Sequence, residues 1–158
     1  MSEEQTKQAL ARIATCTDPD ALKIMAKNAL RSGELKVLHA AQLRLYAILP
    51  SAKPGTLEHG VWQSIHALED ALGNERGKTT RLTRTRQKID RDGEHKTVSD
   101  LVLGKVSDGF NMLVERGMPK LTFEAVALLH AKDFDDTILA AAEKRLVDAG
   151  FDRSALLQ

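Results

Sequence analysis

The chain has 158 residues, with 23 Lys and Arg against 22 Asp and Glu, and its length fits one domain or a compact domain with an appendage. Its single cysteine, Cys16, excludes an intramolecular disulfide and a cysteine-rich zinc site. No stretch approaches the roughly 18 apolar residues of a membrane span, and no basic and apolar leader follows Met1. We therefore expect a cytoplasmic protein in a reducing compartment.

The N-terminal unit, residues 1–50, is expected to form three helices. Residues 2–5 have the form of a capping box, which opens the first helix. Asp18 suits the cap of the second helix and Gly33 suits its end. The third helix, over 34–49, is apolar around most of its circumference, a pattern typical of a central helix.

A stretch with prolines and a glycine then predicts a linker over 51–57. Apolar residues beyond it repeat at alternating steps of three and four, which predicts one long helix over 58–92. Gly73 and Gly77 lie inside this helix, and each costs about 1 kcal/mol relative to Ala. A kink or a short break at 73–77 is the alternative to a continuous helix.

The last part, residues 93–158, is expected to form a C-terminal cluster of shorter helices. A turn is predicted over 91–96, and helices are predicted at 98–103 and 108–116. Thr122 is expected to cap a further helix, and the last helix is predicted at 136–149. No convincing alternation of period two predicts a strand. The predicted fold is all-α, with seven to eight helices, a long central basic helix between the two ends, and one compact globular domain overall.

Motifs for catalysis, cofactors and metals do not point to a site. The stretch 73–80 resembles a phosphate-binding loop only in Gly77, Lys78 and Thr79, because its first glycine is one position too close and no strand precedes it. The five histidines include no pair one turn apart, which a zinc site would need. Acidic residues at 133–136 are better explained by helix capping. We expect no catalytic, cofactor-binding or metal-binding residue, and a protein that is not an enzyme.

The most informative feature is the basic segment, residues 76–91. Residues 74–96 hold eight Lys or Arg against four Asp or Glu, whereas 97–158 hold seven against ten. A local excess of positive charge attracts anions. Arginine outnumbers lysine by five to two in the basic segment, and arginine binds phosphate in a bidentate fork.

On a helix, this segment separates into an apolar side and a basic side. Leu82 and Ile89 continue the apolar pattern, while cations at spacings of three and four share another face. The hypothesis is a nucleic-acid-binding protein, with DNA as the expected partner, RNA left open and no cofactor. The expected phosphate contacts are Arg76, Lys78, Thr80, Arg81, Thr83, Arg84, Arg86, Lys88 and Arg91.

Three alternatives stay open at this point. The cations could pair with acids of 97–158 and form an ordinary solvated face. The chain could be a protein–protein adaptor or a homodimer, in which the basic face meets an acidic partner surface. It could also be a nuclease or an accessory subunit of one. A membrane surface is disfavoured, because the basic segment lacks the bulky apolar face of an interfacial helix.

Overall fold

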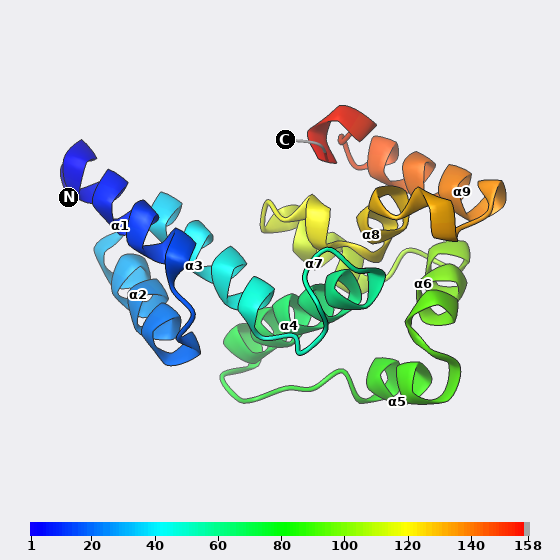
Figure 1. Ribbon diagram of the computed structural model, residues 1–158, viewed down its shortest axis with the longest axis horizontal. Coiled ribbons are helices and arrows are strands. Elements are labelled where there is room, and N and C mark those ends of the chain that lie inside the picture. Colours follow the sequence, from blue (N-terminus) through cyan, green and yellow to red (C-terminus); the bar gives the residue numbers. More distant parts are fainter. Residues whose placement is uncertain (157–158) are drawn as a thin grey trace. The chain divides into compact units, whose positions relative to one another are not determined.

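The computed structural model describes residues 1–156, and within that range the regular structure is entirely helical. Within residues 1–156, nine α-helices and three short 3₁₀ helices follow one another, in the order that Figure 1 shows. This confirms the all-α prediction, although the predicted number of seven to eight helices is too low. None of the helices in the described range has both the length and the apolar character needed to cross a membrane.

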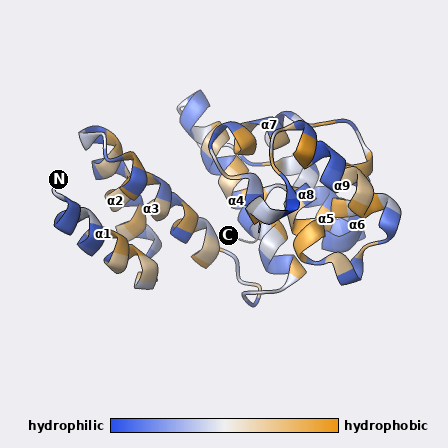
Figure 2. Ribbon diagram, turned by 90° about the horizontal axis from the view of Figure 1, so that it is seen from above, coloured by the Kyte–Doolittle hydropathy of each residue, from blue (hydrophilic) through white to orange (hydrophobic). Residues whose placement is uncertain are grey.

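The chain divides into two compact units, Met1–Ser51 and Ala52–Gln158. In both units the helices carry hydrophobic and hydrophilic residues side by side along the ribbon (Figure 2). This is the pattern expected of helices that bury one face and expose the other.

The N-terminal unit contains α1 (Glu3–Thr15), α2 (Pro19–Ser32) and α3 (Leu35–Ile48). The capping box at Ser2 is present, because the Ser2 hydroxyl accepts from the Gln5 N–H at 3.2 Å and the Ser2 N–H donates to Gln5 Oε1 at 2.9 Å. Asp18 caps α2, and Gly33 ends it in the left-handed region, with φ of 74°. The helices therefore begin and end where local sequence signals predict them.

The described part of the C-terminal unit contains six α-helices: α4 (Leu57–Arg76), α5 (Thr83–Asp92), α6 (Glu94–Leu103), α7 (Asp108–Glu115), α8 (Phe123–Leu129) and α9 (Asp136–Asp148). Short 3₁₀ helices lie at Pro119–Leu121, Ala131–Asp133 and Arg153–Leu156. Thr122 caps α8 and Asp135 caps α9, each by accepting a hydrogen bond from a backbone N–H three residues later. Both caps confirm sequence predictions.

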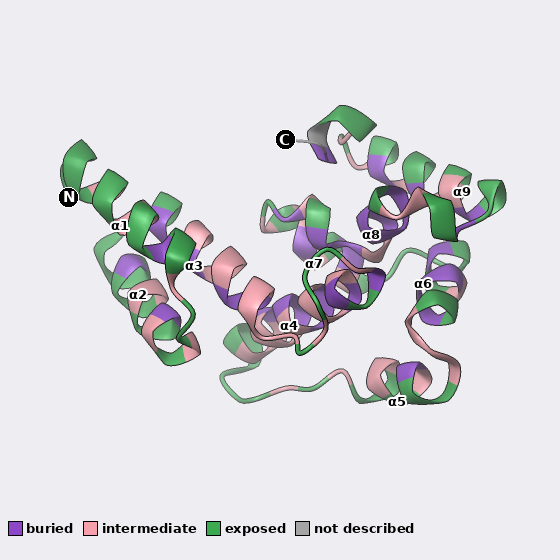
Figure 3. Cartoon of the chain, in the orientation of Figure 1, coloured by how far each residue is buried: buried purple, intermediate pink, exposed green. Residues whose placement is uncertain are grey.

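The core of this unit forms where α8 packs against α9 and where α6 packs against both. α8 is almost entirely buried, as Figure 3 shows in purple, and its residues 124–128 all lie in the interior. α4 contributes Val61 and Ile65, which have no exposed surface. Ile89 of α5 joins the same core at 5% exposure, with Leu82 partly buried beside it. The predicted apolar side of the basic segment is therefore its packed side.

The prediction of one continuous helix over 58–92 is wrong. α4 ends at Arg76, and Gly77 follows in the left-handed region with φ of 68° and ψ of 20°. Residues 77–82 are not helical, and α5 starts at Thr83. Figure 1 shows this stretch as the extended connection that leads from α4 into α5. A glycine at this position favours termination because it adopts positive φ without a steric penalty.

The connection also turns back along α4. A Cβ atom built on Gly73 would lie 3.3 Å from the Lys78 carbonyl oxygen, so Gly73 leaves room for the returning chain. Further along, the Leu82 N–H donates to Glu69 Oε2 at 2.8 Å. The two glycines therefore produce a full break, which is larger than a kink.

The predicted turn at 91–96 is also shorter than expected. Only Gly93 separates α5 from α6, with φ of 87° and ψ of 168°. Glycine adopts this backbone conformation easily. Gly93 is therefore both the C-cap of α5 and the N-cap of α6. As a result α6 begins at Glu94, four residues before the predicted helix at 98.

Candidate nucleic-acid interface

The basic segment, residues 76–91, spans three local structures. Arg76 is the last residue of α4, Lys78 and Arg81 lie in the extended connection, and the remaining four cations lie on α5. Arg81 is therefore not part of a continuous helical face with the cations of α5. The side chains fall into two groups, which differ in whether a carboxylate holds them.

Arg86 belongs to the first group, because Glu69 of α4 binds its guanidinium through two hydrogen bonds. Arg86 Nε and Nη2 donate to the two Glu69 oxygens, each at 2.7 Å. The same guanidinium lies over the Trp62 ring, 5.2 Å from its centroid. The two side chains are only 25% and 12% exposed. Arg86 thus serves to attach α5 to α4.

The charge state of Glu69 follows from these contacts. Burial alone would raise the pKa of Glu69, but the hydrogen bonds from Arg86 and from the Leu82 N–H outweigh burial and hold the pKa below its ordinary value. The same hydrogen bond raises the pKa of Arg86. A stably ionised Glu69 therefore fixes the start of α5 as well as the Arg86 side chain.

Lys88 is the second cation held by carboxylates. Its Nζ lies 2.7 Å from Asp100 Oδ2 and 3.0 Å from Asp92 Oδ2. Lys96 also contacts Asp100, at 3.1 Å. These hydrogen bonds raise the pKa of Lys88 and lower the pKa of both aspartates. Arg86 and Lys88 together are called the paired cations below.

Four cations form the second group, called the exposed cations below: Arg76, Lys78, Arg81 and Arg84. Each side chain is exposed, and none forms an ion pair with any residue in the described range. They lie within nine consecutive residues of the chain. Arg91 is intermediate in character, because its side chain is 68% exposed but its Nε lies 3.4 Å from Asp92 Oδ1.

Two threonines of the predicted set accompany the exposed cations. Thr83, the first residue of α5, is exposed, whereas the Thr80 hydroxyl donates to the Lys78 carbonyl oxygen at 3.1 Å. α5 begins at the Leu82 cap position without a side-chain cap, so its first N–H groups receive no side-chain acceptor from that position. Uncapped N–H groups and nearby guanidinium groups are both suited to binding phosphate oxygens.

The charge of Arg81, one of the exposed cations, acts on His66 of α4. Burial lowers the pKa of His66, and the positive charges of Arg86 and Arg81 lower it further, while Glu69 acts in the opposite direction. Arg81 therefore lies close enough to α4 to repel a proton from the imidazole. As a result, the His66 imidazole loses its proton at a lower pH than an ordinary histidine.

The histidines, the cysteine and the acidic residues of the described chain are not gathered into a metal site. His130 is the C-cap of α8. His95 is exposed and its ring stacks on Phe134, with centroids 4.6 Å apart. Cys16 is half-buried. Across residues 1–156, no three His, Cys, Asp or Glu side chains are grouped so as to hold a metal ion.

One alternative drawn from the sequence is that the cations pair with acids of 97–158, and Lys88 does pair with Asp100 of that stretch. The sequence singles out neither Asp100 nor Glu69 as a partner of the basic segment. Lys88 and Asp92 lie four residues apart, which is a recognisable helical pairing. Glu69 lies 17 residues before Arg86, and Asp100 lies 12 residues after Lys88. No local pattern marks contacts of that separation.

Comparisons with protein family models, with curated proteins and with solved structures found no match to this chain.

Proposed function

We propose that this protein binds nucleic acid, DNA in the first instance, through phosphate contacts made by the exposed cations Arg76, Lys78, Arg81 and Arg84. The observation that carries the proposal is that these four side chains are exposed and unpaired within the described residues, although acids occur elsewhere in the same unit. Cations that no carboxylate neutralises can release the counterions of a phosphate backbone on binding.

The chemistry of the exposed cations favours phosphate over other anionic partners. Three of the four are arginines, whose planar guanidinium matches a phosphate through two parallel hydrogen bonds. The Thr83 hydroxyl and the uncapped N–H groups at the start of α5 add neutral donors of the kind that position a phosphate backbone. We include the cytoplasm, the expected location of a chain with one free thiol, in this proposal.

Some residues that the sequence predicted as phosphate contacts already have partners within the protein. The guanidinium of Arg86 and the ammonium of Lys88 already donate to carboxylates, so a phosphate would have to displace these ion pairs. We assign Arg86 and Lys88 to the support of α5. Arg91 and Thr80 are assigned to the margin of the interface, because each already has a weak or local partner.

The experiment that tests this function is a binding measurement over a salt series. Fluorescence anisotropy with labelled duplex and single-stranded DNA would give the dissociation constant from about 50 to about 300 mM salt. Replacing all four exposed cations by Gln should flatten the logarithmic salt dependence by roughly three units, at about 0.7 to 0.9 per phosphate contact. Only Arg76 and Arg84 of the four lie in helices, and Gln retains most of the helix propensity of Arg, so the fold should persist.

Two results would count against the proposal. The wild-type protein could fail to bind either DNA even at the lowest salt. Alternatively, the quadruple variant could retain the wild-type salt slope, which would place any phosphate contacts elsewhere. Circular dichroism of the variant is the control for folding, and should match the wild-type helical spectrum.

A further inference from the structure

Helix α2 of the N-terminal unit carries a second set of unpaired cations. Lys23, Lys27 and Arg31 are all exposed, and none of them forms an ion pair with any residue in the described range. No Asp or Glu occurs between residues 21 and 33. Lys23, Lys27 and Arg31 are called the α2 row below.

The α2 row follows one side of its helix. Its members are four residues apart, so each Cα atom lies about 6 Å further along the helix axis than the one before. Residues at this spacing are neighbours on a helix surface, and like charges in such a pair destabilise the helix. The row contains two such pairs, Lys23 with Lys27 and Lys27 with Arg31. A bound polyanion would relieve the repulsion in both pairs.

Local effects account for only one of these three cations. Arg31 lies in the last turn of α2, where a positive charge is favourable because the helix C-terminus carries a partial negative charge. Lys23 and Lys27 lie further from that end and gain little from it. Asp20, in the first turn, lies three residues before Lys23 but forms no ion pair with it within the described residues. The fold therefore gives the two lysines no structural task.

Other helices of the chain show how a merely solvated face is arranged. On α9, Lys144 and Asp148 are also four residues apart, and Lys144 Nζ lies 2.7 Å from Asp148 Oδ2. On α6, Lys96 and Asp100 form the same kind of pair at 3.1 Å. The α2 row has a second cation at the position where α6 and α9 have an acid.

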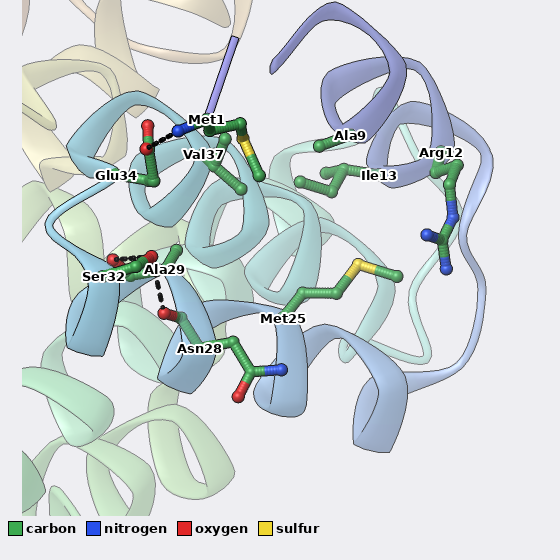
Figure 4. A pocket seen from close by; sticks show the side chains of 10 residues that line it. All are labelled: Met1, Ala9, Arg12, Ile13, Met25, Asn28, Ala29, Ser32, Glu34 and Val37. Carbon is green, nitrogen blue, oxygen red and sulfur yellow. Dashed lines mark hydrogen bonds and ion pairs between the residues drawn. The ribbon is translucent and has the colours of Figure 1, made fainter. Parts of the chain in front are cut away.

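Glu34 is the acid that follows the α2 row most closely in the sequence, and it already has a cationic partner. It borders a hollow of about 230 Å³ in the N-terminal unit, whose buried lining residues are all apolar. Figure 4 shows that Glu34 is joined there to the amine of Met1, 3.3 Å away. Because the Met1 amine compensates Glu34, this acid does not neutralise Arg31 three residues before it.

Two exposed aliphatic side chains flank the α2 row and help to define its partner. Ile24 is 60% exposed and Leu30 is 63% exposed. At about 100° per residue they lie on either side of the row, so the cations occupy the middle of the exposed face. A helix that binds a membrane surface has the opposite order, with apolar residues in the middle of the face that meets the lipid. A charged centre favours a phosphate backbone over a lipid surface.

We propose that the α2 row is a second phosphate-contact surface, so that the two units of this chain bind one nucleic-acid strand together. This inference rests on the proposed function of the exposed cations in the C-terminal unit and adds a separate site on the N-terminal unit. Linking two weak sites in one chain makes the second contact intramolecular, and the combined affinity then exceeds that of either site alone.

The test measures the affinity of the full chain for single-stranded DNA of two lengths, about 10 and about 60 nucleotides, by fluorescence anisotropy. Only the long strand reaches both units, so the wild-type protein should bind it about tenfold or more tightly than the short strand. Lys23→Gln with Lys27→Gln should remove most of this gain. It should also flatten the salt slope on the long strand by roughly one and a half units, at about 0.7 per phosphate contact. Arg31 is left unchanged because it also stabilises the end of α2.

Lys96→Gln with Lys144→Gln is the matched control. It also removes two positive charges from helix surfaces, but each of these lysines pairs with an aspartate four residues away. This variant should keep the wild-type gain with length and the wild-type salt slope. Gln has nearly the helix propensity of Lys, so circular dichroism should show the wild-type helical content in both variants.

The outcomes separate this inference from the proposed function. The α2 row would be rejected, with the proposed function intact, if Lys23→Gln with Lys27→Gln left both the gain with length and the salt slope unchanged while the quadruple variant of the exposed cations flattened the slope. Equal losses in the two double variants would also reject it. So would a variant of the two α2 lysines that keeps its DNA affinity but no longer binds phosphatidylserine vesicles, since the row would then contact membranes. Failure of the wild type to bind either strand would overturn the proposed function and this inference with it.

Discussion

Arg84 and Arg86 lie two residues apart on α5 but have opposite environments. Arg84 is exposed and has no ion-pair partner within the described residues, whereas Arg86 is 25% exposed, bonded to both oxygens of Glu69 and placed over Trp62. The basic segment is therefore not one uniform surface. Its residues divide according to where carboxylates of α4 and α6 lie, and this division separates cations that stabilise the fold from cations that remain available to a partner.

The largest expected effect comes from making the same substitution at both positions. Arg86→Gln leaves Glu69 poorly solvated without its partner, and should lower the free energy of unfolding by about 2 kcal/mol, less than for a fully buried pair. Arg84→Gln should change it by less than about 0.5 kcal/mol. Urea denaturation measures both. An equal loss of unfolding free energy in the two variants would contradict the distinction between Arg86 as a paired cation and Arg84 as an exposed one.

A second prediction concerns pH. The pKa of Glu69 in the folded protein lies below its ordinary value of 4.5, so the unfolded chain takes up the proton first as pH falls. The stability that Glu69 contributes is therefore present above about pH 4.5 and is lost as pH falls through the lower folded pKa. The difference in unfolding free energy between wild type and Glu69→Gln should shrink over that range. A difference that stays constant with pH would show that Glu69 charge does not stabilise the fold.

A third prediction concerns the break after Arg76 that carries Lys78, Arg81 and Arg84 away from α4. Gly77 has φ of 68°, and a Cβ atom there would meet no other atom within 4 Å. The cost of Gly77→Ala is therefore conformational, about 1 kcal/mol in unfolding free energy. Gly77→Asn should cost less, because Asn tolerates the left-handed region. If Ala were as stable as Gly, the break would not depend on this glycine.

The smallest expected effect is on a single histidine. Arg81→Gln removes one of the charges that lower the pKa of His66, so this pKa should rise towards its ordinary value while burial still holds it down. Arg84→Gln should leave it unchanged. An NMR titration of the His66 imidazole distinguishes the two variants. A His66 pKa that does not respond to Arg81→Gln would mean that this arginine lies further from α4.

Local capping signals explain the part of the fold that could be predicted from sequence. Ser2, Asp18, Thr122 and Asp135 each bond to an N–H two or three residues away, so the capping residue and the start of the helix are visible together. The wrong prediction of a continuous helix over 58–92 came from a periodic pattern and not from a local cap. Leu82 and Ile89 keep the apolar spacing of α4 although they belong to a chain that has already turned back.

The basic segment could be located from the sequence, but its paired and exposed cations could not be told apart. A concentration of cations with few nearby acids is visible in the chain, whereas the partners of Arg86 and Lys88 come from α4 and α6. Tertiary contacts of this kind depend on how helices pack and leave no local pattern.

The central claim is that the placement of the cations, and not the net charge, determines phosphate binding. Two double variants test it, because Arg81→Gln with Arg84→Gln and Lys88→Gln with Lys96→Gln each remove two positive charges. The measurement is the logarithmic salt dependence of the affinity for single-stranded DNA. We predict that the first pair flattens the slope by roughly one and a half units, whereas the second pair, whose lysines both contact Asp100, leaves it unchanged. Equal flattening by the two pairs would contradict the account.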